Sequence, residues 1–129
     1  RGHARKLEAS NPVELEDFRA EVARALTEIR AQKARDGKRA LERRIGRLDR
    51  TVADLADALE LDPAQSELMR SALVTSYDRE ADVLRRMEQG AGPDVTGELR
   101  GADREAHELE VSAFLNETQL AKYAKRAGW

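Results

Sequence analysis

Six apolar residues recur at alternating steps of four and three along residues 41–59, and this repeat constrains the fold more than any other feature of the chain. They are Leu41, Ile45, Leu48, Val52, Leu55 and Leu59. Such spacing places all six side chains on one side of an α-helix, where they can pack against a second helix as a coiled-coil seam. No segment alternates apolar and polar residues with a period of two, so no β-strand is predicted. The repeat therefore predicts an all-α protein held together by helix–helix seams.

Capping and loop signals divide the chain into helices. Asn11, Pro12 and Glu14 have the pattern of a helix start, and residues 89–93 form the strongest loop signal. An earlier apolar stripe over residues 18–29 is two positions out of phase with the seam, which predicts a break near Asp36-Gly37, although one continuous helix remains the alternative. The prediction is a flexible tail (1–10) and a single helical domain (11–129), with helices over residues 12–35, 38–60, 63–88, 94–115 and 117–127.

The composition favours an extended, hairpin-like bundle of four to five helices over a thick globular core. Charged residues make up 37% of the chain and aromatic residues 4%, as is typical of long solvated helices. Charge is segregated: residues 30–50 carry nine basic and three acidic residues, whereas residues 53–117 carry sixteen acidic residues and six arginines. The basic segment could be an arm for an anionic partner or a helix lying antiparallel to acidic helices, within one fold or a dimer. Its apolar repeat favours the second interpretation.

Several function classes fit this composition poorly. The chain has no cysteine, so disulfides and thiolate catalysis are excluded, and no window approaches the roughly 18 apolar residues of a membrane span. Because the chain begins with Arg1, an upstream signal peptide or membrane anchor remains possible. His3 and His107 are the only near-neutral acid–base groups, and there is no glycine-rich phosphate loop. Acidic character and few aromatics argue against nucleic-acid binding. A binding protein is therefore expected, and not an enzyme.

One set of residues has spacing compatible with part of a metal site. Asp103, His107 and Glu110 lie on one face of a predicted helix, and two carboxylates with an imidazole could bind a divalent transition metal such as zinc, nickel or cobalt. A tight site needs about four ligands, so His3 or a second His107 across a dimer axis would have to contribute. The alternative is a surface histidine that forms salt bridges with its neighbours and needs no cofactor.

A short motif occurs twice, 54 residues apart. The first copy is Leu61-Asp62-Pro63-Ala64-Gln65 and the second is Leu115-Asn116-Glu117-Thr118-Gln119. In each copy a leucine closes one helix, and Asp62 or Asn116 can cap the next. Gln65 and Gln119 stand at the third helical position, from which a side chain can reach back to the cap's backbone N–H. Both copies therefore predict a reciprocal cap at a bend between two helices.

This doubled pattern resembles the LTxxQ motif of the Spy/CpxP family of periplasmic helical proteins, over roughly residues 40–126. Asp62 and Asn116 stand where the motif has threonine. The resemblance implies a periplasmic, all-α, thin and curved subunit that forms an antiparallel homodimer with a concave face. It also implies binding of unfolded protein clients without ATP, or restraint of a membrane stress sensor, and related envelope proteins sense metals.

The candidate client surface is the basic helix. Its residues would be Arg39, Leu41, Arg43, Ile45 and Arg47, because a charged face with scattered apolar residues can hold a partly folded chain loosely. In the alternative interpretation the basic residues are a solvated face and the leucines are dimer core. The function expected is thus that of a stress-related binding protein. A metal-sensing periplasmic domain and a coiled-coil oligomerisation module of a membrane-anchored protein are the alternatives.

Overall fold

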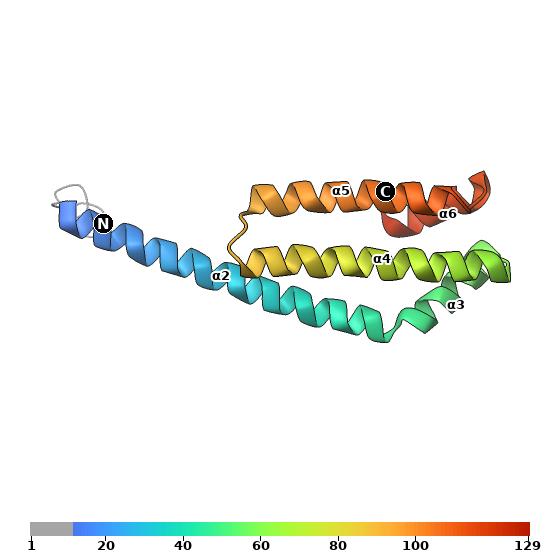
Figure 1. Ribbon diagram of the computed structural model, residues 1–129, viewed down its shortest axis with the longest axis horizontal. Helices are drawn as coiled ribbons and strands as arrows, with labels where there is room; N and C mark the ends of the chain where they lie inside the picture. Colours follow the sequence, from blue (N-terminus) through green and yellow to red (C-terminus); the bar gives the residue numbers. More distant parts are fainter. Residues whose placement is uncertain (1–11) are drawn as a thin grey trace.

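In the described part of the chain, residues 12–129, three long helices lie side by side and two short helices gather at one end of them (Figure 1). The structure is a computed structural model that describes residues 12–129. The helices are α2 (Pro12–Gly46), α3 (Leu48–Leu59), α4 (Pro63–Glu88), α5 (Pro93–Ser112) and α6 (Glu117–Ala127). No strand occurs within residues 12–129, and the predicted all-α class is confirmed.

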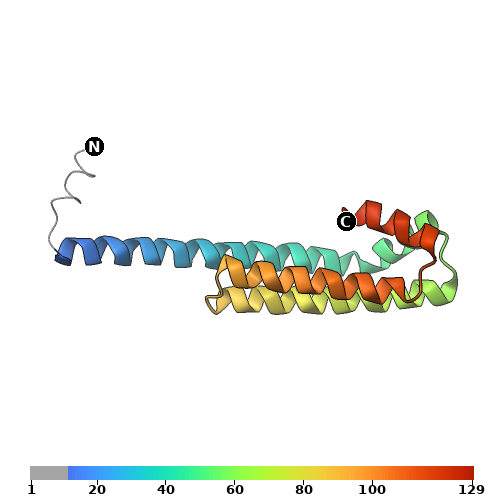
Figure 2. The ribbon, with the colours of Figure 1, turned by 90° about the horizontal axis from the view of Figure 1, so that it is seen from above.

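Helix α4 is the centre of the arrangement. It packs against α2, α3 and α5, and it runs antiparallel to both α2 and α5 (Figure 1). Figure 2 shows that α3 and α6 lie together beyond the far end of α2. Among the described helices, none is both long and apolar enough to cross a membrane.

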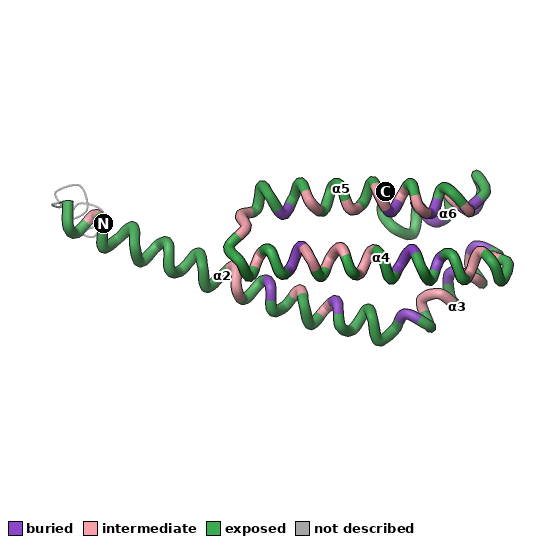
Figure 3. The backbone as a smooth tube through the Cα atoms, viewed as in Figure 1, coloured by how far each residue is buried: buried purple, intermediate pink, exposed green. Residues whose placement is uncertain are grey.

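The main core lies at the end of the molecule where α3 and α6 meet α4 and α5. Its buried side chains come from four helices and the loop before α6: Leu48, Leu55, Leu59, Met69, Ala72, Leu73, Val111, Leu115 and Tyr123. Leu59, Met69 and Val111 are almost fully excluded from solvent. The short helices therefore stabilise one end of the long hairpin, and a smaller set of buried residues, Ala34, Val83 and Leu84, lies between α2 and α4 outside this core. The first half of α2, beyond the hairpin, is almost entirely exposed (Figure 3).

The predicted break near Asp36-Gly37 is wrong, because α2 continues without interruption to Gly46. The chain bends ten residues later, where Arg47 has φ −104° and ψ 10°. There the Arg47 N–H donates to the Arg44 carbonyl at 3.1 Å, a tighter turn than an α-helix makes, and Thr51 N–H then donates to the Arg47 carbonyl at 2.9 Å. Gly46 lies directly before this bend, and glycine is a weak helix former that is common at helix kinks.

Gly37 has a packing role instead of a helix-breaking one. A Cβ atom at this position would lie 2.6 Å from Cδ2 of Leu84, which is itself buried on α4. The missing side chain therefore lets Leu84 pack directly on the backbone of α2.

The bend at Arg47 also divides the predicted seam. Leu48, Leu55 and Leu59 enter the main core, whereas Ile45, on the other side of the bend, is 51% exposed. A continuous coiled-coil seam over residues 41–59 is therefore not formed within the chain. The predicted helices over residues 63–88 and 117–127 coincide with α4 and α6, while α5 ends at Ser112, three residues before its predicted end.

Candidate functional site

Both copies of the repeated motif form the predicted reciprocal cap. At the start of α4, the Gln65 N–H donates to Asp62 Oδ1 at 2.7 Å, and the Asp62 N–H donates to Gln65 Oε1 at 3.1 Å. At the start of α6, the Gln119 N–H donates to Asn116 Oδ1 at 2.8 Å, and the Asn116 N–H donates to Gln119 Oε1 at 3.0 Å. Each box satisfies two backbone donors at a helix start. The predicted caps are thus confirmed at both bends.

The two motifs also contact each other through their glutamines. Gln65 Nε2 donates to Gln119 Oε1 at 2.8 Å, and Gln119 Nε2 is 3.1 Å from Gln65 Oε1. Each Nε2 also reaches the opposite bend: Gln65 donates to the Phe114 carbonyl at 2.9 Å, and Gln119 donates to the Leu59 carbonyl at 3.2 Å. The α3–α4 bend and the α5–α6 bend are therefore joined by a nearly symmetric set of hydrogen bonds.

The leucines of the motif lie at the edge of this joint. Leu115 is buried in the main core, and Leu61 packs against the core while remaining partly exposed. Gln119 is 7% exposed, so its amide makes these contacts out of water, where an unpaired polar group is costly. The recurrence of the motif was the only sequence signal for this joint. The caps alone did not predict that the two copies would touch.

No family model, curated protein or solved structure matches this chain. The resemblance to the Spy/CpxP family therefore rests on the two motifs.

His107 occupies a buried position between α5 and α6. Its Nε2 atom lies 2.7 Å from the Tyr123 hydroxyl, and its ring packs against Tyr123 and edge-on to Trp129, with centroids 5.8 and 5.9 Å away. Its Nδ1 atom is buried without a hydrogen-bond partner, 3.9 Å from Glu110 Oε1. Burial lowers the pKa of His107, against an opposing effect of the Glu110 carboxylate, and burial raises the pKa of Tyr123 to about 12. His107 is therefore a neutral packing residue and not an exposed histidine.

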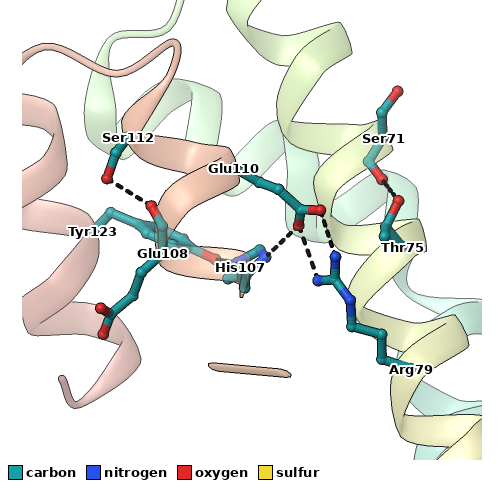
Figure 4. A network of polar contacts seen from close by, with 8 residues as sticks. All are labelled: Ser71, Thr75, Arg79, His107, Glu108, Glu110, Ser112 and Tyr123. Carbon is teal, nitrogen blue, oxygen red and sulfur yellow. Dashed lines mark hydrogen bonds and ion pairs between the residues drawn. The ribbon is translucent and has the colours of Figure 1, made fainter. Parts of the chain in front are cut away.

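Glu110 is held by an arginine from the neighbouring helix. Arg79 donates to both of its carboxylate oxygens, at 3.0 and 2.6 Å (Figure 4). This bidentate pair lowers the pKa of Glu110 and raises the pKa of Arg79. It also provides the main polar link between α4 and α5 beside His107.

The residues of the predicted metal site are only partly brought together. His107 and Glu110 are neighbours, but neither is free to bind a metal. Nε2 of His107 is hydrogen-bonded to the Tyr123 hydroxyl, and both carboxylate oxygens of Glu110 accept hydrogen bonds from Arg79. Asp103 is half-buried on the wall of an adjacent cavity. Within residues 12–129 no group of three or more histidine, cysteine or acidic side chains is placed to hold a metal ion. His3, the other suggested ligand, lies outside the described residues, as do Asn11 and the predicted tail.

The predicted client surface needs one correction. Arg39, Arg43 and Arg47 are exposed on α2 and its bend, and Ile45 is 51% exposed. Leu41 is only 4% exposed. It therefore belongs to the core and cannot contact a client. The spacing of the stripe could not show this, because the burial of a residue on α2 depends on how this helix packs against α4.

A groove that the sequence did not predict runs between α2 and α5, with α4 as its floor. One part is a cavity of about 290 Å³, lined among others by Arg44, Tyr77 and Asp103. A second cavity, of about 380 Å³, lies nearer the α4–α5 loop and is lined by residues that include Ile29, Met87 and Pro93. Arg100 lines both cavities, so we treat them as one α2–α5 groove.

Proposed function

We propose that the protein is a periplasmic, stress-related binding protein of the Spy/CpxP type that holds partly folded protein clients without ATP. The observation that carries this proposal is the joint between the two motifs, in which Gln65 and Gln119 bond to each other across two bends. A repeated motif whose copies meet in space is an architectural element, and two unrelated helix caps would have no reason to meet. Restraint of a membrane stress sensor is the other activity of this type that would use the same binding surface.

The surface proposed for client binding is the exposed side of α2 near its bend. Arg39, Arg43 and Arg47 are long, flexible cations, and Ile45 supplies an exposed apolar side chain. Such side chains can follow an irregular chain, with their aliphatic stems against apolar groups and their charges in water. They favour loose binding of unfolded, acidic segments over a fixed complex.

The test is suppression of client aggregation without nucleotide. We expect the wild-type protein to prevent aggregation of a chemically unfolded client at a near-stoichiometric ratio. A triple Arg39→Ala, Arg43→Ala, Arg47→Ala variant is expected to lose most of this activity while keeping its helical content. The matched control replaces three other exposed cations, Lys122, Lys125 and Arg126 of α6, with alanine. No suppression by the wild type, or equal loss in both triple variants, would reject this proposal.

An oligomerisation module is the second candidate function, and one observation favours it. Apolar side chains on the first half of α2 are exposed, including Val22 at 42% and Leu26 at 46%.

A metal-sensing role is less well supported, because Glu110 already has an arginine partner. Calorimetric titration of zinc, nickel and cobalt into the wild type and a His107→Ala variant tests that role. A binding heat that requires His107 would favour it.

A further inference from the structure

The cavity of about 290 Å³ in the α2–α5 groove has the features of a site for a small ligand. Its walls come from three helices and from Trp129, which follows α6. Its size is close to that of pockets that take small organic molecules, roughly 300–1,000 Å³. Aromatic rings and arginines line it together. None of Arg39, Arg43 and Arg47 lines it, so the cavity is separate from the surface proposed for client binding.

Trp129 forms an aromatic end wall of this cavity. Its indole ring meets His107 and Tyr123 edge-on, with ring centroids 5.9 and 5.4 Å away. The Trp129 N–H donates to the Ala124 carbonyl at 2.9 Å, at the end of α6. These contacts hold the ring in place, yet it stays partly exposed, as does Tyr77 on α4. A flat apolar group in the cavity could therefore pack against an aromatic wall that is already formed.

The charges of the lining leave one positive charge in excess. Arg100 is matched by Glu80, whose carboxylate oxygens accept from it at 3.3 and 3.1 Å, so this pair is neutral. Asp103 is the other acid of the lining, and its side chain makes no ion pair within residues 12–129. Two cations stand against it, Arg44 and Arg104. A ligand with a single negative charge would therefore neutralise the lining.

Arg44 is the cation best placed to bind such an anion. It makes no ion pair in the described part of the chain, and its guanidinium carbon lies 5.6 Å from the centroid of the Tyr77 ring. This cation–π contact holds the guanidinium without neutralising it, so its N–H groups remain available to a carboxylate. Arg104 lines the opposite wall, on α5. Its ion pair with Glu108, at 3.5 Å, joins two exposed side chains and is easily exchanged for a ligand.

We propose that this cavity binds a small aromatic carboxylate. The carboxylate accepts hydrogen bonds from Arg44 and Arg104, and the ring lies against Trp129. An aliphatic carboxylate lacks the group that would cover the indole ring. An aromatic amine places a further cation beside two arginines. The proposal goes beyond client binding and does not depend on it.

The first experiment uses the single tryptophan of the chain as a probe of the cavity. Titration with phenylacetate should change the Trp129 fluorescence and shift its indole N–H resonance in a saturable way. For a ligand of this size the dissociation constant should be on the order of 0.1–1 mM. Binding should weaken as salt is added, because screening reduces the attraction between opposite charges.

Three related compounds identify the groups that the cavity recognises. Acetate, which lacks the ring, and phenylacetamide, which lacks the charge, should each bind roughly tenfold more weakly than phenylacetate, or worse. Phenylethylammonium keeps the ring but reverses the charge, and it should not bind.

The second experiment changes the charges of the lining and measures phenylacetate binding by calorimetry. Arg44→Gln should weaken binding roughly tenfold, with helical content retained because Arg44 is exposed. Asp103→Asn should strengthen binding, since it removes an acid that repels the carboxylate, and a merely structural effect would not. Lys38→Gln, which removes an exposed cation of α2 outside the cavity, is the matched control. A double Glu80→Gln, Arg100→Gln variant removes a neutral pair and should bind like the wild type.

Four results would overturn the inference. They are the absence of a saturable change with phenylacetate, binding of phenylacetamide or phenylethylammonium as tight as that of phenylacetate, equal loss of binding in Arg44→Gln and Lys38→Gln, and weaker binding by Asp103→Asn. None of these results would by itself abolish aggregation suppression, so the inference and the proposed function can fail separately.

Discussion

Gln65 and Gln119 each use both acceptor positions and both donor hydrogens of their side-chain amide. In each residue, Oε1 accepts from the cap backbone and from the other glutamine. In each residue, Nε2 donates to a carbonyl of the opposite bend and to the other glutamine. Two short motifs therefore fix the position of α6 against the α3–α4 bend.

Replacement of Gln119 by alanine should lower the free energy of unfolding by about 1–3 kcal/mol, because buried donors and acceptors at both bends lose their partner. The comparable cap substitution Asp62→Ala should cost about 1 kcal/mol. Urea denaturation measures both. Gln32→Ala, at an exposed glutamine of α2, is the control and should change stability by less than about 0.5 kcal/mol.

The contact between the glutamines is tested by a double-mutant cycle. Gln65→Ala and Gln119→Ala should be non-additive, with a coupling energy on the order of 1 kcal/mol, because each removes the other's partner. Additive costs would mean that the two caps act independently and that the joint adds no stability.

His107 should make stability depend on pH below neutrality. Burial lowers its pKa in the folded protein, while the unfolded chain has the ordinary value of about 6.5. Below that value the unfolded state binds more protons, so the free energy of unfolding falls as the pH falls from about 7 to about 5. The neighbouring charges, Glu110 and Arg79, act in opposite directions on this histidine.

The measurement is urea unfolding over this pH range for the wild type and His107→Gln. The variant should be less stable at pH 7 and show a flatter profile. His3→Ala controls for loss of an imidazole elsewhere in the chain. An unchanged slope in His107→Gln would contradict the assignment. The lowered carboxyl pKa values of Glu110 and Asp82 act in a separate window, below about pH 4.5.

At the scale of helices, local signals predicted some boundaries well and others poorly. The starts of α4 and α6 were predictable because a capping box involves only residues within four positions of one another. The break in α2 was misplaced because Gly37 and Gly46 look alike in a sequence. Only the position of Leu84 on α4 distinguishes the glycine that packs from the one that lies at the bend.

The same glycine-to-alanine change should therefore have different effects at two helical positions. Gly101→Ala should raise the free energy of unfolding by about 0.5–1 kcal/mol, because its Cβ meets open space and alanine is the better helix former. Gly37→Ala should give no such gain, since its Cβ would lie 2.6 Å from Leu84. Thermal and urea unfolding of both variants measure the difference.

Repeating the Gly37→Ala substitution in a protein that lacks the Leu84 side chain tests whether Leu84 is what prevents the gain in stability. In a Leu84→Ala protein, the Gly37→Ala change should become stabilising, as at Gly101, because the obstructing methyl group is gone. Equal stabilisation at Gly37 and Gly101 in the wild-type background would show that α2 can move away from α4 at no cost.

Across the whole molecule, burial and charge are both unevenly distributed. The main core lies where α3 and α6 meet the hairpin, whereas the first half of α2 is exposed. The sequence correctly predicted an all-α chain, but it could not predict which apolar residues are buried. The apolar stripes over residues 18–29 and 41–59 have similar spacing in the sequence. Yet Leu48, Leu55 and Leu59 of the second stripe enter the main core, whereas the first stripe lies on the exposed half of α2.

Hydrogen exchange should reveal this uneven distribution, and its dependence on protein concentration tests whether the first half of α2 serves oligomerisation. Amides of α4 around Met69 and Leu73 should exchange slowly at every protein concentration, since these residues are buried within one chain. Amides of residues 15–29 should exchange rapidly in dilute solution and become protected as concentration rises, because dimerisation would cover their apolar face. A Leu26→Asp, Ile29→Asp variant, which places charges on this exposed apolar face, should exchange rapidly at both concentrations. Protection of residues 15–29 that is independent of concentration would mean that contacts within a single chain order the first half of α2, and it would contradict a role of this half in oligomerisation.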